Sequence, residues 1–170
     1  QKITAQKVYV HEQYYKNCND IVLIYLSNPV NITDKVNFIC LPGQEAPVGY
    51  TVYSIGWGRQ AELTTASCSP QLKQASLNVM ECDGFYDPST YDNKKQICAR
   101  ASDGSGSPCG GDLGDPLMFQ YYGQWYLNGI YSANGCRSDG RSIFFTRVSY
   151  YLSWIQEKIA LAKLLTTQNG

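Results

Sequence analysis

Seven cysteines and one histidine are the side chains of this 170-residue chain with the widest chemical use. The histidine is His11, and no two cysteines form a Cys-x-x-Cys pair, so a zinc site has almost no ligands to draw on. Seven cysteines instead indicate disulfides and an oxidising compartment. We therefore expect a secreted, extracellular protein with no metal and no cofactor.

A glycine-rich loop covers residues 105–117, where the sequence reads SGSPCGGDLGDPL. It resembles the nucleophile loop of trypsin-like serine peptidases, which reads Gly-Asp-Ser-Gly-Gly-Pro, with Leu113 in place of the serine. Leucine has no hydroxyl to deprotonate and no lone pair with which to attack a carbonyl. The resemblance therefore implies a catalytically inactive homologue, a pseudoprotease, in which peptidase chemistry is lost.

Six further segments extend the resemblance over nearly the whole chain and follow the family's order. They read NDIVLIYL (19–26), FICLP (38–42), SIGWG (54–58), QICA (96–99), GIYS (129–132) and TRV (146–148). Members of the family fold into two antiparallel β-barrels with the active site between them. The resemblance therefore implies an all-β, trypsin-like double-barrel protein.

The pattern of apolar residues agrees with strands up to residue 145. Short apolar segments alternate with clusters of Gly, Pro, Asn and Ser, which is typical of many short strands. These segments are 7–10, 21–26, 50–55, 116–119 and 124–131. Near the end, we expect one amphipathic helix over residues 149–165, with an apolar stripe that docks on the barrel. Its members are Tyr151, Trp154, Ile155, Ile159 and Ala162.

Charge and hydropathy exclude two classes of partner. Fourteen basic and fourteen acidic residues give a formal net charge of zero, and no run of Lys and Arg exceeds two. The basic surface of a nucleic-acid-binding protein is therefore absent. No apolar run approaches the ~20 residues that are needed to cross a bilayer, so we expect no membrane span.

The resemblance does not extend to the first part of the family's domain. The family's Ile-Val-Gly-Gly amino terminus and its Ala-Ala-His-Cys motif are both absent. We interpret residues 1–170 as a partial domain: the end of the first barrel and the crossover at 1–45, the complete second barrel at 46–148, and the C-terminal helix at 149–165. An incomplete barrel exposes unpaired strand edges and an apolar face. We therefore expect a heterodimer with a partner chain that carries the missing N-terminal part.

Several catalytic positions of the family can be assigned through the resemblance. Asp20 stands at the position of the triad aspartate, Leu113 at that of the nucleophile, and Gly111 at that of the oxyanion-hole glycine. We expect Asp20 to remain as a hydrogen-bonded residue near the barrel junction, and His11 to be an ordinary exposed histidine rather than a base. Asp112 corresponds to the aspartate that receives a new amino terminus on zymogen cleavage, and a carboxylate in the core needs a partner.

The specificity pocket also departs from the family pattern. Ser107 stands at the base position where trypsins carry an aspartate, and Ala133 and Asn134 replace a Trp-Gly pair. Ile143 stands where a pocket-wall glycine is expected, so we expect its side chain to fill the volume that a substrate side chain would occupy. Asp115 replaces the second glycine of the nucleophile loop. Together these departures argue against a hidden peptidase activity.

The resemblance also implies two disulfides, one between Cys82 and Cys98 and one between Cys109 and Cys136. The second would tie the nucleophile loop to the pocket wall. Each closed loop is worth about 3 to 4 kcal/mol of stability in the chain-entropy model.

Three cysteines remain outside these bridges, and an odd total of seven means that at least one cannot pair within the chain. Cys40 is the candidate for an interchain disulfide, because its family counterpart commonly links to the segment before the protease domain. Cys18 and Cys68 either pair with each other or bind the missing chain. A third family bridge is missing at both ends, where Val52 and Phe119 stand and are expected to fill the core.

The leading interpretation is a secreted, non-catalytic serine peptidase homologue that binds proteins as a carrier, ligand or cascade cofactor. Clustered aromatic residues at 14–15, 85–86 and 120–122 are candidate contact surfaces, unless they only cover the barrel. Asn31 begins an N-glycosylation pattern and is expected to carry a glycan. Two alternatives stay open: a trypsin-like endopeptidase that has lost its nucleophile by an engineered or incidental change, and a structural subunit of an extracellular assembly.

Overall fold

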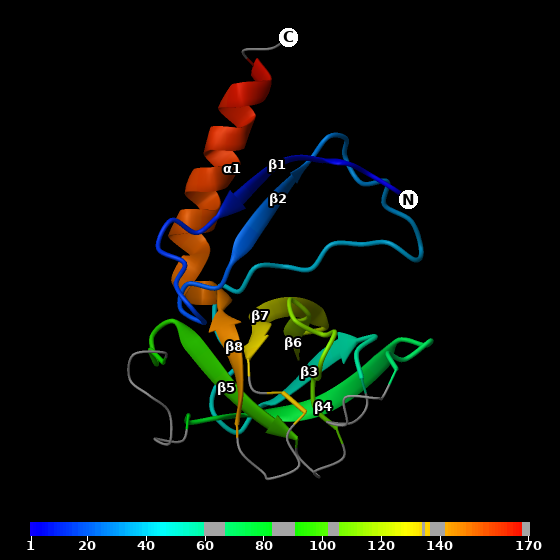
Figure 1. Ribbon diagram of the computed structural model, residues 1–170, viewed down its shortest axis with the longest axis vertical. Coiled ribbons are helices and arrows are strands. Elements are labelled where there is room, and N and C mark those ends of the chain that lie inside the picture. The colour runs from blue at the N-terminus through cyan, green and yellow to red at the C-terminus, as the bar shows by residue number, and fades with distance from the viewer. Residues whose placement is uncertain (60–66, 83–90, 102–105, 134, 137–141, 168–170) are drawn as a thin grey trace.

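Eight strands and a C-terminal helix make up the computed structural model of this chain, which describes residues 1–59, 67–82, 91–101, 106–133, 135–136 and 142–167 (Figure 1). Two strands form a small antiparallel sheet, β1 (Ala5–Val10) and β2 (Val22–Leu26). The other six close a barrel. They are β3 (Thr51–Gly56), β4 (Lys73–Met80), β5 (Gln96–Ala101), β6 (Pro116–Tyr121), β7 (Gln124–Ala133) and β8 (Ile143–Arg147).

The barrel runs in the order β3-β4-β5-β8-β7-β6, with every pairing antiparallel and with β6 returning to β3. Along β3 the exposed and buried side chains alternate, because successive side chains of a strand point to opposite faces. The inward side chains form one apolar core that includes Leu77, Leu117 and Phe145. The expected all-β barrel with a C-terminal helix is therefore confirmed.

Val52 and Phe119 both lie in this core. The prediction that these two residues are buried in the core, where the family has a third disulfide, is therefore confirmed. Their side chains are apolar, so packing takes the place of a covalent link there.

The C-terminal helix joins the barrel to the two-stranded sheet. A 3-10 turn at Val148–Tyr151 leads into α1 (Leu152–Thr167), two residues beyond the expected end of the helix. Tyr151 and Ile155 pack with Ile21 in a second apolar cluster, against which Leu23 of β2 and Leu127 of β7 also lie. Figure 1 shows α1 rising beside β1 and β2, away from the barrel. Among the described residues, no helix has the length and apolar character that a membrane span needs.

One member of the predicted helix stripe is wrong. Ile159 is 43% exposed, whereas Lys158 is only 8% exposed and occupies the buried face. The long stem of a lysine can cover apolar surface while its ammonium group stays paired. The Lys158 Nζ lies 2.5 Å from a carboxylate oxygen of Glu12 and 3.0 Å from one of Glu157. The ion pair between Lys158 and Glu12 therefore links the turn after β1 to α1. Hydropathy alone would place a lysine on the exposed face.

His11 is half-buried, so the expectation of an ordinary exposed histidine is wrong. Its ring packs at 5.4 Å from that of Tyr151 and at 5.1 Å from that of Trp154, measured between centroids. Burial lowers the pKa of His11 below its usual value. Its Nδ1 accepts a hydrogen bond from the backbone N–H of Gln13, at 3.2 Å. His11 thus packs the turn after β1 against the helical segment.

Both disulfides implied by the resemblance are present, Cys82–Cys98 and Cys109–Cys136. Neither includes Cys18, Cys40 or Cys68, although all three lie in the described part of the chain. The structure therefore has no disulfide between Cys18 and Cys68, one of the two alternatives for these cysteines.

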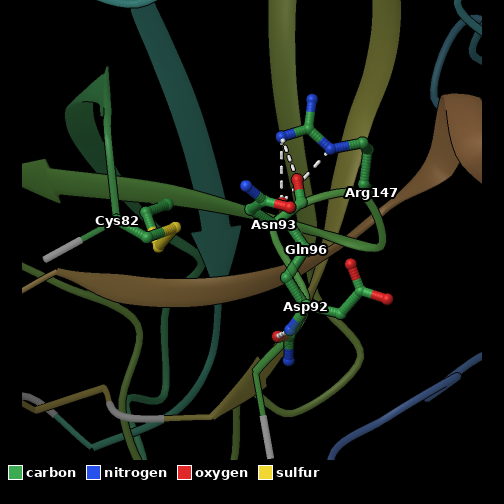
Figure 2. The surroundings of a disulfide bond; sticks show 6 residues. Cys82, Asp92, Asn93, Gln96 and Arg147 are labelled. Atoms are coloured by element: carbon green, nitrogen blue, oxygen red, sulfur yellow. Dashed lines mark hydrogen bonds between the residues drawn. A yellow bond between two sulfur atoms is a disulfide. The ribbon is translucent and has the colours of Figure 1, made fainter. Parts of the chain in front are cut away.

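An arginine holds the turn next to the first disulfide in place (Figure 2). Arg147 Nη2 donates to the carbonyl oxygens of Gln96 at 2.9 Å and of Asn93 at 3.2 Å, and its Nε donates to Gln96 at 3.2 Å. On its other side, Arg147 Nη1 pairs with the carboxylate of Glu45. One guanidinium group thus links β8 to the turn before β5 and to the segment before β3.

We expect Arg147→Ala to lower the free energy of unfolding by about 2–3 kcal/mol, because two carbonyls and a carboxylate lose a charged donor. Arg147→Lys should recover only part of this loss, since an ammonium group lacks the planar fork that reaches both sides. Urea denaturation followed by circular dichroism measures the difference. Lys94→Ala, on the exposed side of the same turn, is the matched control and should stay within about 0.5 kcal/mol of the parent. An unchanged midpoint for Arg147→Ala would contradict the assignment.

Candidate functional site

The glycine-rich loop is held at both ends by backbone hydrogen bonds. At one end, the Cys136 backbone N–H donates to the Pro108 carbonyl at 2.8 Å, beside the disulfide from Cys109. At the other, the Gly114 N–H donates at 2.9 Å to a carbonyl of β7. Gly111 and Gly114 have φ of +102° and +93°, a backbone region in which a side chain would be strained. The loop is therefore fixed in a conformation that requires its glycines.

Asp112 turns inward from this loop and is 7% exposed. One carboxylate oxygen accepts a hydrogen bond from the backbone N–H of Gly58 at 2.5 Å, and the other accepts one from that of Cys109 at 2.9 Å. Both oxygens of this buried carboxylate therefore have a hydrogen-bond donor. Asp112 therefore anchors the loop to the end of β3.

Asp115 brings a second carboxyl group against Asp112. Its Oδ2 is buried, and its backbone N–H donates to the Asp112 carbonyl at 2.9 Å. Burial, together with the facing Asp112 carboxylate, raises the pKa of Asp115 to about 6. Asp115 Oδ2 has no hydrogen-bond partner among the described residues, so this carboxyl group is buried beside a second carboxylate with no donor to compensate it. The sequence comparison noted Asp115 but attached no structural role to it.

A raised carboxyl pKa makes the folded chain bind its proton more tightly than the unfolded chain does. The contribution of Asp115 to stability is then greatest below about pH 4, falls as the pH rises from about 4 to about 6, and levels off above. Asp115→Asn should remove this fall and raise the free energy of unfolding at pH 7 by about 1–2 kcal/mol, after allowance for partial exposure. Thermal melts from pH 4 to pH 8 test the prediction. Asp34→Asn, on an exposed loop, should leave the pH profile unchanged.

Leu113 lies at the outer side of the loop and is 67% exposed. Its neighbours Asp112 and Gly114 are both held by the hydrogen bonds described above, so the backbone presents position 113 to solvent in a fixed orientation. A leucine side chain there has no group that can attack, donate or accept. The position can therefore only make apolar contacts.

A cavity of about 300 Å³ opens beside Asp112, between the loop and strands β3 and β4. Ser107 and Pro108 line it from the loop side, and Ser54 and Ala75 from the strands. The family resemblance assigned Ser107 to the base of a former specificity pocket, and it named none of the strand residues that line this cavity. The SIGWG motif (54–58) could have indicated them, because its two glycines face Asp112.

The former pocket residues do not all meet in this cavity. Ile143 is buried in the barrel core, and Ala133 lies opposite Phe144 in the β7–β8 pair. Neither lines the cavity that holds Ser107. Asn134 lies outside the described residues.

Asp20 lies at the junction between the two-stranded sheet and the barrel. Its carboxylate accepts a hydrogen bond from the Ser132 hydroxyl at 2.6 Å, and its carbonyl accepts one from the Thr146 hydroxyl at 2.7 Å. The carbonyl of Tyr131 accepts the hydrogen bond from Gly114, and the hydroxyl of the next residue, Ser132, donates to Asp20. Adjacent residues of β7 therefore position the glycine-rich loop and Asp20. No group of three or more His, Cys, Asp or Glu side chains within the described residues could hold a metal ion.

A closed antiparallel barrel with a C-terminal helix, and a disulfide-tied glycine loop anchored by a buried aspartate, define a chymotrypsin-like serine protease domain. The family model for trypsin matches residues 1–155, so the chain belongs to the trypsin family.

Among the curated relatives, chymotrypsin-C from Mus musculus is 35% identical over 163 residues, which cover 91% of this chain and 60% of that protein. Phenoloxidase-activating factor 3 from Holotrichia diomphalia is 34% identical over 170 residues, covering 94% of this chain and 48% of that protein. CLIP domain-containing serine protease B4 from Anopheles gambiae is 29% identical over 169 residues, covering 92% and 47%. The chain thus spans about half to three fifths of the length of these relatives.

Proposed function

We propose that this chain is a secreted, non-catalytic member of the trypsin family that acts by binding other proteins. The observation that carries the proposal is the exposed side chain of Leu113, the residue that the sequence resemblance assigns to the nucleophile position. Without a hydroxyl there, no covalent acyl intermediate forms, whatever the surrounding groups. Loss of the nucleophile alone costs about six orders of magnitude in the kcat of subtilisin.

An exposed apolar face on the two-stranded sheet supports the second part of the proposal, a partner chain that completes the first barrel. Val8 pairs with Ile24 across β1 and β2, and Val10 pairs with Val22. All four side chains are exposed, on a sheet with two outer edges. Further strands paired with these edges would cover this face and remove both.

Two further residues fit such a partner. Asp112 borders the cavity of about 300 Å³ and could receive a free amino terminus as the family aspartate does. Cys40 is half-buried, and it is the candidate for an interchain disulfide. Asn31 is exposed and accessible to glycosylation.

The surface offers two described aromatic pairs for protein contacts, at Tyr14 and Tyr15 and at Tyr121 and Tyr122. All four side chains are exposed, and Tyr122 reaches 91%. Exposed aromatic residues are common anchors at protein interfaces. The third candidate surface, at 85–86, lies outside the described residues. Because one relative is named a phenoloxidase-activating factor, we favour a cofactor in an activation cascade over a carrier or ligand.

Labelling of the natural protein with a serine-directed fluorophosphonate tests the loss of activity. We expect no adduct, whereas a site-specific adduct would overturn the proposal in favour of an active peptidase. A gel of natural material with and without reducing agent tests the partner. We expect a smaller mass on reduction, and an unchanged mass would remove the interchain disulfide at Cys40. Native mass spectrometry then distinguishes a two-chain binder from a subunit of a large assembly.

A further inference from the structure

A cavity of about 670 Å³ lies on the barrel beside the β6–β7 hairpin and apart from the glycine-rich loop. One side is the segment before β3, and the other is formed by aromatic residues of β6 and β7. Its lining comprises Gly43, Gln44, Glu45, Pro47, Tyr50, Phe119, Tyr121 and Tyr126. The volume falls in the range of about 300–1,000 Å³ that is usual for ligand sites.

Aromatic rings of this cavity are held against one another. Phe119 stacks on Tyr126 with centroids 5.4 Å apart, and Tyr50 meets Phe119 edge-on at 6.2 Å. The Tyr50 hydroxyl also donates to the Gln120 carbonyl at 3.0 Å, which fixes its ring. Phe119 is buried, whereas Tyr50 and Tyr121 are exposed. The cavity therefore has a rigid apolar floor and tyrosine walls.

The charge in this cavity is already balanced. Glu45 is its one carboxylate, and both its oxygens are engaged, one by the Arg147 guanidinium and the other by the Ser149 hydroxyl. A cationic ligand would have to compete with this pair. A sugar would need several convergent amides or carboxylates for its hydroxyls, and Gln44 is the only other such side chain in the lining. The cavity therefore suits a neutral, apolar group.

Strand addition cannot bring a peptide here, because β7 has both edges paired at this point. Tyr126 lies opposite Phe119 of β6 on one side. On the other, the Leu127 N–H donates to the Cys40 carbonyl at 2.9 Å, and the Cys40 N–H donates to the Trp125 carbonyl at 3.2 Å. An extended peptide must therefore bind through its side chains and its free carbonyls. A polyproline II helix has flat apolar rings and unpaired carbonyls, which aromatic grooves recognise.

We propose that the cavity between residues 43–50 and the β6–β7 hairpin binds a proline-rich, extended segment of a protein partner. The proline rings lie against the exposed rings of Tyr50 and Tyr121, and the hydroxyls of Tyr121 and Tyr126 donate to carbonyls of the peptide. The inference rests on the proposed function, because a protein-binding role supplies the partner. It adds a contact surface on the six-stranded barrel, apart from the exposed face of β1 and β2.

A ten-residue polyproline peptide is the probe, titrated into the 170-residue chain with backbone amide shifts read by NMR. We expect saturable shifts at residues 43–50 and 119–126. We expect Tyr121→Ala to weaken the affinity about tenfold. Leu72→Ala removes an exposed apolar side chain that lies outside the cavity lining, and should change the affinity by less than about twofold. Gln44→Ala, on the opposite wall, is a second variant whose affinity for the peptide should also fall, and it tests the site should Tyr121→Ala alter the fold.

Three results would overturn the inference: no shifts in the cavity, equal binding of a glycine-serine peptide of the same length, or equal losses from Tyr121→Ala and Leu72→Ala. Tighter binding of a neutral hexasaccharide than of polyproline would also overturn it, in favour of a sugar site. None of these results changes the fluorophosphonate experiment, so failure of the peptide site and failure of the proposed function are separately visible.

Discussion

Gly56→Ala should leave the chain unable to form its barrel. A Cβ built on Gly56 would lie 2.0 Å from Asp115 Oδ2 and 2.2 Å from Asp112 Oδ1. Asp112 has little room to retreat, because two backbone N–H groups hold its oxygens. A methyl group here therefore overpacks the site and breaks hydrogen bonds to a buried charge, at a combined cost above about 4 kcal/mol. This approaches the whole stability of a domain at the low end of the usual range, about 5 kcal/mol.

The barrel signal in circular dichroism and the urea midpoint measure this loss. Gly43→Ala is the matched control, since nothing lies within 4 Å of a Cβ at that position. It should change the free energy of unfolding by less than about 1 kcal/mol, through the unfolded state alone. A Gly56→Ala chain with the parent's midpoint would show that the two carboxyl groups are not packed against β3.

Five of the eight described strands coincide with an apolar segment of the sequence, and β4, β5 and β8 do not. Residues 50–55 and 124–131 matched β3 and β7 within two residues. The segment test missed β4, because its apolar residues alternate with polar ones in KQASLNVM, and most of its side chains are not fully buried. Ile159 was misplaced for a related reason. Helical spacing puts it near the stripe, but the ion pair between Lys158 and Glu12 decides which residue is buried.

The candidate site divides in the same way. The disulfide partners and the inward Asp112 could be predicted, because a family resemblance carries them position by position. The contact between Asp112 and Asp115 could not, since it depends on how the loop meets Gly56 across the barrel. The aromatic cavity was also missed as a unit. It joins residues 43–50 to a hairpin some seventy residues later, and only the exposed end of that hairpin drew attention in the sequence.

Leu113→Ser should restore a hydroxyl to the loop without restoring peptide hydrolysis. A serine hydroxyl needs an adjacent base to act as a nucleophile. Residues 1–170 by themselves contain one histidine, His11, and its ring is packed against Tyr151 and Trp154, so this stretch alone offers no free imidazole. Loss of the histidine alone costs about six orders of magnitude in the kcat of subtilisin. The variant should therefore remain at the background rate.

Leu113→Ala is the matched control, because it removes the same apolar side chain without adding a hydroxyl. Position 113 is exposed, so both variants should fold with unfolding free energies within about 0.5 kcal/mol of the parent. Hydrolysis of a peptide ester and labelling by a fluorophosphonate should be indistinguishable between them. Faster labelling of Leu113→Ser would mean that some group other than His11 activates the hydroxyl. In that case the substitution at position 113, rather than a wider loss of catalytic groups, would be what separates this chain from an active peptidase.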